Sequence, residues 1–422
     1  MLEIMSKNKG FKDLPLGLIP YDWEVVTLES ISADKPHAIV DGPFGSNLKT
    51  EHYREQGIPV IQSGFVTSGQ FFAESYVYVD KFLFNAQKRS AVEAGDIVMA
   101  KIGAQCGTSA ILPQDHPIGI LAGNCLKISI NSNKSKTEYI LRLLHYYYDI
   151  GLVDLIKTET AQPAISLKNL RTLLIPIPSL NEQEKIAEIL DKVDSAIALT
   201  EALIKKLKQI KAGLLQDLLT RGLDDNGELR NPDTHPEQFK DSPLGKIPIN
   251  WEVKTLGDIA PLQRGFDLPN SQLKQGNYPV VYSNGILNYH LEKKVKAPGV
   301  VTGRSGTIGQ VTYVNQDYWP HNTSLWVTNF FDNFPRFIFY LYNYIGLEKF
   351  AAGSGVPTLN RNDVHSFKVF IPLRDEQEKI VKILDTQGRA SEKEEEYLKK
   401  LKQKKQGLMQ DLLTGKVRVN HL

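Results

Sequence analysis

The chain has 422 residues, of which 41% are hydrophobic and 23% are charged, and its net charge at pH 7 is +2. This length predicts two or more domains, and the composition is typical of a soluble globular protein. The sequence has no run of about 18 apolar residues, which excludes a membrane span, and no apolar segment within residues 1–10, which excludes a signal peptide. It has only two cysteines, too few for a disulfide framework or a four-ligand zinc site. We therefore expect a cytoplasmic protein.

The first recognisable segment, residues 16–31, returns later in the chain. It reads LGLIPYDWEVVTLESI, and residues 244–259 read LGKIPINWEVKTLGDI, so that Trp23 matches Trp251. Self-similarity of this kind indicates an internal repeat. We therefore expect two halves of related structure.

The region that follows is rich in β-formers and glycine. Residues 77–84 and 95–103 are predicted as short strands, and residues 137–156 as a helical stretch. Residues 58–63 match residues 278–283 in the second half. We assign residues 1–180 to one α+β globular domain.

The next segment, residues 181–222, is predicted as one long helix. Asn181 with Glu184 has the spacing of a capping box, and Gly222 gives a stop. Apolar residues recur at alternating spacings of four and three, which is typical of a coiled-coil seam. The series has ten positions, and all except Thr200 and Lys211 are apolar. The ten are Ile186, Leu190, Val193, Ile197, Thr200, Ile204, Leu207, Lys211, Leu214 and Leu218.

The second half repeats this order. A polar linker, residues 223–243, leads to a second α+β domain, residues 244–373, with β-rich residues 297–314 and helical residues 334–353. A second helix, residues 374–415, starts with the Asp375 and Glu378 spacing and precedes the tail, residues 416–422. Residues 205–220 and 399–414 are identical at 13 of 16 positions.

One such helix cannot bury its seam alone, and its repeat is the nearest partner. We infer an antiparallel intramolecular coiled coil and a pseudo-two-fold internal repeat. A parallel dimer between two chains remains the alternative.

Several loops of the two domains carry side chains suited to reading bases. Arginine and lysine suit guanine, and asparagine and glutamine suit adenine. Residues 41–49 and 263–266 lie at comparable places, as do residues 100–103 and 303–306, where a cation stands beside a glycine in both. Arg304 is the foremost candidate. The full set of candidate DNA contacts is Ser46, Lys49, Gln62, Lys101, Gln105, Arg264, Asn284, Arg304, Ser305 and Asn322.

The sequence contains no recognisable motif of catalytic or metal-binding residues. The chain has no GxxxxGK[ST] phosphate loop, and the glycines of residues 303–309 stand between strand-like runs rather than before a helix. Asn231-Pro232 lacks the second proline and aromatic residue of an amino-methyltransferase loop. His145, His321 and His365 stand apart, so no zinc-ligand pattern is present. We expect no catalytic and no metal site.

The chain resembles the specificity subunits of type I restriction–modification enzymes over nearly its whole length. The resemblance rests on the two-fold alternation of domain and helix, the start motif Ile-Pro-x-x-Trp-Glu-Val at residues 19–25 and 247–253, the Glu-Gln-Glu-Lys-Ile start of each helix, and the Gly-Leu-Leu-Gln-Asp-Leu-Leu-Thr end of the first. Arg374 departs from the proline that the family often has.

The resemblance implies that each globular part is a target-recognition domain reading one half of a bipartite, asymmetric site in double-stranded DNA. It implies that the helices are a spacer that docks two modification subunits, and that restriction subunits join them. S-adenosylmethionine, ATP and Mg²⁺ belong to those partners, and this subunit is expected to be non-catalytic and to need no cofactor. The candidate partner-binding residues are Gln183, Leu215, Gln216, Gln377, Met409 and Gln410.

Two other interpretations compete with this one. A coiled-coil scaffold with two modules for ligands other than DNA would have the same layout, but it gives no reason for near-identical helices to carry strongly diverged domains. A self-contained nucleic-acid enzyme would need the catalytic residues that the sequence lacks.

Overall fold

The computed structural model describes residues 10–14, 17–158, 162–353 and 357–419. The chain divides into two compact units. Unit 1 comprises Met1–Leu199 together with Leu398–Leu422, and unit 2 comprises Thr200–Tyr397. Each unit therefore contains one recognition domain and one half of each long helix. The α+β class and the two-fold repeat predicted from the sequence are confirmed.

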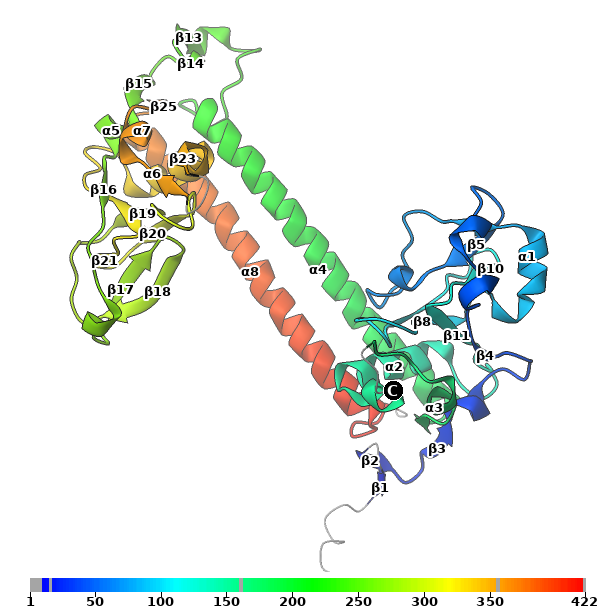
Figure 1. The fold of residues 1–422 in the computed structure, drawn as a ribbon. Helices are drawn as coiled ribbons and strands as arrows, with labels where there is room; N and C mark the ends of the chain where they lie inside the picture. The colour runs from blue at the N-terminus through cyan, green and yellow to red at the C-terminus, as the bar shows by residue number, and fades with distance from the viewer. Residues whose placement is uncertain (1–9, 15–16, 159–161, 354–356, 420–422) are drawn as a thin grey trace, which may run out of the picture. The chain divides into compact units, whose positions relative to one another are not determined.

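Unit 1 contains the first recognition domain and the start of the first long helix (Figure 1). Its elements in chain order are β1 (Phe11–Leu14), β2 (Gly17–Pro20), β3 (Glu24–Thr27), β4 (Ile39–Asp41), β5 (Ile58–Ile61), β6 (Tyr78–Val79), α1 (Lys81–Ala86), β7 (Ala91–Val92), β8 (Ile97–Ala100), β9 (Ser109–Ile111), β10 (Gly119–Leu121), β11 (Cys125–Ile128), α2 (Thr137–Asp149), α3 (Leu167–Arg171), β12 (Leu174–Ile177) and α4 (Leu180–Thr220).

Unit 2 repeats this order with few changes. Its elements are β13 (Phe239–Ser242), β14 (Gly245–Pro248), β15 (Glu252–Thr255), α5 (Leu256–Ile259), β16 (Leu262–Arg264), β17 (Tyr278–Tyr282), β18 (Gly285–His290), β19 (Gly299–Gly303), β20 (Val311–Val314), β21 (Trp319–Pro320), β22 (Ser324–Val327), α6 (Pro335–Ile345), β23 (Ala351–Ala352), β24 (Thr358–Leu359), α7 (Arg361–His365), β25 (Lys368–Ile371) and α8 (Arg374–Leu413).

The two recognition domains share the strand order of their antiparallel sheet and the parallel strand pair of a second sheet, which has four strands in unit 1 and three in unit 2. A four-stranded antiparallel sheet has the order β4-β11-β8-β9 in unit 1 and β16-β22-β19-β20 in unit 2. A second sheet joins β5 to β10 in parallel, as β17 joins β21. These registers place Val60 where Val280 lies and thus confirm the match between residues 58–63 and 278–283.

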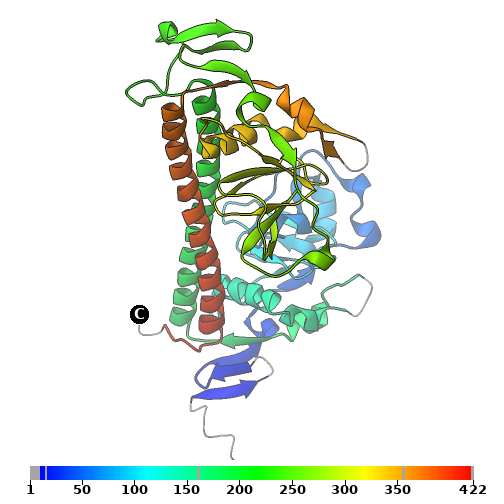
Figure 2. The ribbon, with the colours of Figure 1, turned by 90° about the vertical axis from the view of Figure 1, so that its left-hand side faces the viewer.

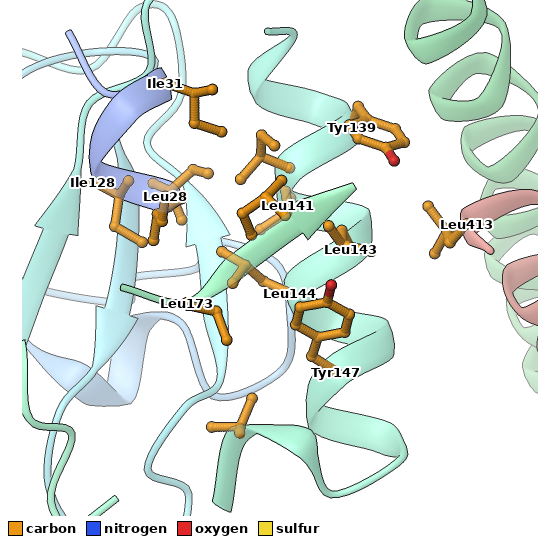
Figure 3. Close-up of a cluster of buried hydrophobic side chains, with 14 of the residues drawn as sticks. Leu28, Ile31, Ile128, Tyr139, Leu141, Leu143, Leu144, Tyr147, Leu173 and Leu413 are labelled. Atoms are coloured by element: carbon orange, nitrogen blue, oxygen red, sulfur yellow. The ribbon is translucent and has the colours of Figure 1, made fainter. Parts of the chain in front are cut away.

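The core of unit 1 packs the sheet against α2 and against the ends of both long helices. Figure 3 shows Tyr139, Leu143 and Leu144 on α2, with Leu413 from the end of α8 facing them. Leu143 and Leu144 are fully buried, and Leu413 is 1% exposed. Burial of a leucine side chain contributes about 1.5–3 kcal/mol, so the end of α8 is an integral part of this unit.

The two long helices pair in opposite directions within each unit, and Figure 2 shows them side by side. In unit 1, Lys405 of α8 lies 2.6 Å from Asp194 of α4. In unit 2, Lys208 of α4 lies 2.7 Å from Glu395 of α8. These pairs confirm the antiparallel intramolecular coiled coil and are incompatible with the parallel dimer.

The predicted seam is the buried side of both helices. In α4 every one of its positions is buried or half-buried, including polar Thr200 and Lys211. In α8 the equivalent positions, among them Gln387, Ser391 and Glu394, are buried or half-buried as well. The 3.5-residue period therefore identified the packed side even where the residues are polar.

Some local predictions were wrong. The first helix starts at Leu180, and the hydroxyl of Ser179, rather than Asn181, accepts a hydrogen bond from the Glu182 amide at 3.3 Å. Only Tyr78–Val79 of the strand predicted at 77–84 is extended. Asp80 caps α1 at once, because its carboxylate accepts from the Leu83 amide at 2.8 Å. Gly222 does end α4, with a φ of 61°.

Candidate nucleic-acid interface

Each recognition domain brings four loops together at the end of its sheet. In unit 1, the amide of Lys101 donates to the Asn124 carbonyl at 2.8 Å, and the amide of Ile165 donates to the Lys101 carbonyl at 2.8 Å. In unit 2, Arg304 has the same place: its amide donates to the Thr323 carbonyl at 2.9 Å, and its carbonyl accepts from the Leu359 amide at 2.8 Å. The proposed match of Lys101 with Arg304 is therefore a match of backbone positions.

A glycine packs against a neighbouring loop in both clusters. A Cβ atom on Gly42 would lie 1.9 Å from the carbonyl oxygen of Ala122, and one on Gly265 would lie 2.2 Å from that of His321. No side chain fits at either position. The loops at 41–49 and 263–266 thus start from equivalent points, as the sequence predicted.

Strand register identifies the residue beside each glycine as a third equivalent pair. Asp41 lies opposite Leu126 on β11, and Arg264 lies opposite Leu325 on β22. Since Ala100 pairs with Cys125 and Gly303 pairs with Ser324, the two sheets superpose in register. Asp41 in the first domain therefore occupies the place of Arg264 in the second.

The candidate cation of the first domain is already paired. The Lys101 Nζ atom lies 2.6 Å from the Asp41 carboxylate and 4.0 Å from the centre of the Phe44 ring. The Lys101 side chain is 13% exposed and that of Asp41 is 11% exposed. Arg89 adds a second cation, 3.5 Å from the other carboxylate oxygen. Lys101 is therefore held inside the domain.

The candidate cations of the second domain differ in exposure, and Arg304 is half-buried. Arg264 is 53% exposed in its side chain and lies 3.1 Å from Asp267, which is itself 69% exposed. Asn322 donates to the same carboxylate. The guanidinium of Arg304 forms no ion pair with any residue that the structure describes. Two arginines thus stand where the first domain has an acid and a base.

The other predicted DNA contacts are divided between the two clusters. Gln62 is half-buried and follows β5, while Gln105 and Lys49 are exposed, with Lys49 3.6 Å from Glu51. Asn284 is exposed in the turn between β17 and β18, and Ser305 is half-buried beside Thr358. The side chain of Ser46 lies outside what the structure describes.

An aromatic pair that the sequence analysis missed lies in the second cluster. The rings of Tyr282 and His321 stack with centroids 4.3 Å apart, and burial lowers the pKa of His321 below its ordinary value. His321 is therefore mainly neutral at pH 7. Its place directly before Asn322 was the available signal, but the stacking partner comes from a distant strand.

The predicted partner-binding residues differ in accessibility. Gln183 is fully buried, and Gln377 is 1% exposed. The carboxamide oxygen of Gln183 accepts from the Lys136 amide at 2.8 Å, and that of Gln377 accepts from the Phe334 amide at 2.8 Å. In this structure both side chains join a long helix to its recognition domain and are not available to a partner.

The remaining four lie at the ends of the helices. Met409 is 4% exposed within the core of unit 1, and Leu215 is half-buried in unit 2. Gln216 and Gln410 are exposed at equivalent positions of α4 and α8. The two exposed glutamines are the members of the set that can contact another protein.

The described residues contain no group of three or more histidine, cysteine or acidic side chains placed to hold a metal ion. None of their helices is both long enough and apolar enough to cross a membrane.

The comparisons with known proteins agree on one family. The family model described as "Type I restriction modification DNA specificity domain" matches residues 20–209 and 248–403. The chain is 27% identical over 444 aligned positions to the putative type I restriction enzyme MjaX specificity subunit of Methanocaldococcus jannaschii, with 98% of each chain covered. It is 24% identical to the MjaVIII specificity subunit of the same organism, with 99% of this chain and 98% of that protein covered.

A solved structure shows the same fold. The S subunit of the type I restriction–modification system from M. genitalium matches 92% of this chain and 96% of its own, with a TM-score of 0.57 and 16% sequence identity. At this identity the likeness concerns the fold alone.

Proposed function

Because the chain belongs to the type I restriction–modification DNA specificity family, we propose that it reads a bipartite, asymmetric site in double-stranded DNA, with one recognition domain for each half-site. One observation carries the proposal. The two domains share strand order and register, yet the pair Asp41 and Lys101 in one is replaced by Arg264 and Arg304 in the other. A common framework with different side chains at its loops suits two readers of unlike sequences.

The loop chemistry supports base reading. Arginine binds guanine through two hydrogen bonds in the major groove, and glutamine or asparagine binds adenine in the same way. Arg304, Gln105 and Asn284 bring such groups to the loop clusters, and Gln105 and Asn284 are exposed. Phosphate contacts add affinity without sequence information, which suits the exposed Lys49.

The helix pair supports a spacer and a docking site for partner subunits. At about 1.5 Å per residue, the 41 residues of α4 extend roughly 62 Å. The ends of the helices carry near-identical sequences, with exposed Gln216 in one and Gln410 in the other. A repeated surface of this kind would bind two copies of one partner, which we take to be the modification subunits.

In this proposal the chemistry resides in the partners. Modification subunits would bind S-adenosylmethionine and methylate adenine, and restriction subunits would use ATP and Mg²⁺. The present chain would supply specificity and need no cofactor of its own.

The test is to express the chain with its modification subunit and to map methylated adenines across the host genome. We expect one motif made of two short half-sites separated by a fixed gap of unspecified bases. A complex that binds DNA without any such motif would contradict the proposal. A complex that ignores DNA would favour the alternative, a coiled-coil scaffold with two modules for other ligands.

A further inference from the structure

The two recognition domains differ in charge at one pair of equivalent backbone positions. Asp41 and Arg264 are equivalent by strand register, and Lys101 and Arg304 are equivalent by their backbone hydrogen bonds. The pair is therefore neutral in the first domain and doubly positive in the second. We propose that Arg304, in the same loop cluster as Arg264, reads guanine in the second half-site, whereas the Asp41–Lys101 pair of the first domain contacts no base. This inference rests on the proposed function.

Burial distinguishes Asp41 from Arg264, while Lys101 and Arg304 are both half-buried. Asp41 is 8% exposed, and the Lys101 ammonium is enclosed between the Asp41 carboxylate and the Phe44 ring. A buried carboxylate needs its counter-ion, because a single buried charge without a partner is strongly destabilising. If Lys101 left Asp41 for a base, the carboxylate would keep only Arg89, which lies 3.5 Å away and is 48% exposed. Its role is to complete the loop framework.

The second domain lacks this internal partner. Arg264 replaces the acid, and the nearest described carboxylate to it, Asp267, is on an exposed loop and also accepts from Asn322. Two cations in place of an acid and a base raise the positive potential of the cluster, which attracts an anionic or acceptor-rich ligand. Guanine presents two acceptors, N7 and O6, in the major groove, at the spacing of an arginine fork. The second cluster is therefore suited to such a ligand.

The fixed backbone of Arg304 favours base reading over a loose phosphate contact. Its amide and carbonyl are both held, at 2.9 and 2.8 Å, by the turn residue Thr323 and by Leu359 of β24. Gly303 allows this packing, since a Cβ there would lie 1.7 Å from the Thr307 carbonyl oxygen. A side chain whose backbone is held in this way can contact one base pair in a constant geometry.

The first test changes Arg304 in the complex with the modification subunit. Arg304→Gln should relax the preference for guanine at one position of the second half-site by roughly 5- to 150-fold, with the first half-site unchanged. Arg304→Lys keeps the charge but loses the fork, so it should also relax that preference while retaining overall affinity. The readouts are the genome-wide methylation motif and binding to duplexes that differ at that base pair.

The matched test changes the first domain. Lys101→Met alone should lower the midpoint of urea unfolding, because it leaves Asp41 with only Arg89, 3.5 Å away and 48% exposed, as a counter-ion, whereas the double variant Asp41→Asn with Lys101→Met should recover much of that loss. In both variants, the fraction that folds should keep the wild-type motif in both half-sites.

Several outcomes overturn the inference. Uniform weakening by Arg304→Gln on all sequences, with a smaller salt dependence, would make Arg304 a phosphate contact. A changed first half-site in the folded double variant would make Lys101 or Asp41 a base reader. An unaltered second half-site in Arg304→Gln defeats the inference but leaves the proposed function standing. A wild-type complex without a bipartite motif defeats both.

Discussion

Single residues show how equivalent positions acquire different roles. Lys101 and Arg304 have the same backbone bonds, but only Lys101 has a buried carboxylate within reach. Gln183 and Gln377, by contrast, keep one role in both halves, because each carboxamide oxygen accepts from a backbone amide at the start of a domain helix. The residues that tie a helix to its domain have been kept, and those in the loop clusters have changed.

His145 leads to a prediction about pH. Its ring donates to the Ser109 carbonyl at 2.8 Å, and burial lowers its pKa below the ordinary value. The unfolded chain therefore binds a proton more readily than the folded one, so stability is complete above about pH 6.5 and falls as the pH drops below it. His145→Gln keeps a donor and removes the titration, so its unfolding midpoint should fall less between pH 7.5 and pH 5.5.

Exposed His235, changed to glutamine in the same way, is the control for that experiment. Wild-type protein and the His235→Gln variant should lose similar stability over this range. His321 and His365 also have lowered pKa values from burial, so the His145→Gln variant should keep part of the dependence. Equal losses in all three proteins would contradict the assignment to His145.

At the scale of elements, each long helix starts with a glutamate, buried in α4 and half-buried in α8, that pairs with an arginine from a distant part of the chain. Glu182 of α4 accepts two hydrogen bonds from Arg418, both at 2.8 Å. Glu376 of α8 accepts a hydrogen bond from Arg230 at 2.6 Å. Both arginines follow the glycine that ends the opposite helix. The tail after α8 and the linker after α4 therefore have the same role in their own units: each supplies the arginine that pairs with the glutamate at the start of a long helix.

Removing Arg418 should destabilise unit 1. Arg418→Met leaves Glu182, which is 1% exposed, without its counter-ion, at a cost of about 3 kcal/mol. We expect a lower midpoint in urea unfolding. Lys416→Met is the matched control, because Lys416 is 69% exposed and pairs only at the surface. A loss in Arg418→Met no greater than in Lys416→Met would show that the tail does not hold this unit together.

The elements that the sequence predicted best are those with a strong local pattern. The seam of α4 was identified in full, because apolar periodicity depends only on the order of residues along one helix. The caps were less certain, since Ser179 and Asn181 are both good capping residues two positions apart. Residues 77–84 read as a strand by composition, but one aspartate at position 80 was enough to start a helix.

The correspondence of the loops in the two domains was predicted, but their electrostatics were not. The match of Lys101 with Arg304 followed from the repeat, and the register bears it out. The ion pair of Lys101 with Asp41, 60 residues apart, depends on the approach of β4 to β8 across β11. Glu182 and Arg418 are 236 residues apart. Such pairings come from tertiary packing, which one sequence without its homologues does not reveal.

For the whole molecule, the division of labour predicts the result of a domain exchange. Residues 1–180 hold all the loops of the first cluster, whereas the loops of the second lie within residues 244–373. Replacing residues 1–180 by those of another family member should change one half-site of the methylation motif and leave the other as it was. Concerted change in both half-sites would mean that the domains do not read independently.

The helix pair predicts a second effect on the whole molecule. Both units contain part of α4, so a four-residue insertion in this helix adds about 6 Å of rise and slightly more than one turn. If α4 sets the gap between the half-sites, the unspecified spacer in the methylation motif should change in length while both half-site sequences persist. The same four residues placed between Asp225 and Asn226, in the exposed turn after α4, should leave the motif unaltered. New half-site sequences, or an unchanged spacer in a folded helix variant, would mean that the helices do not measure the DNA.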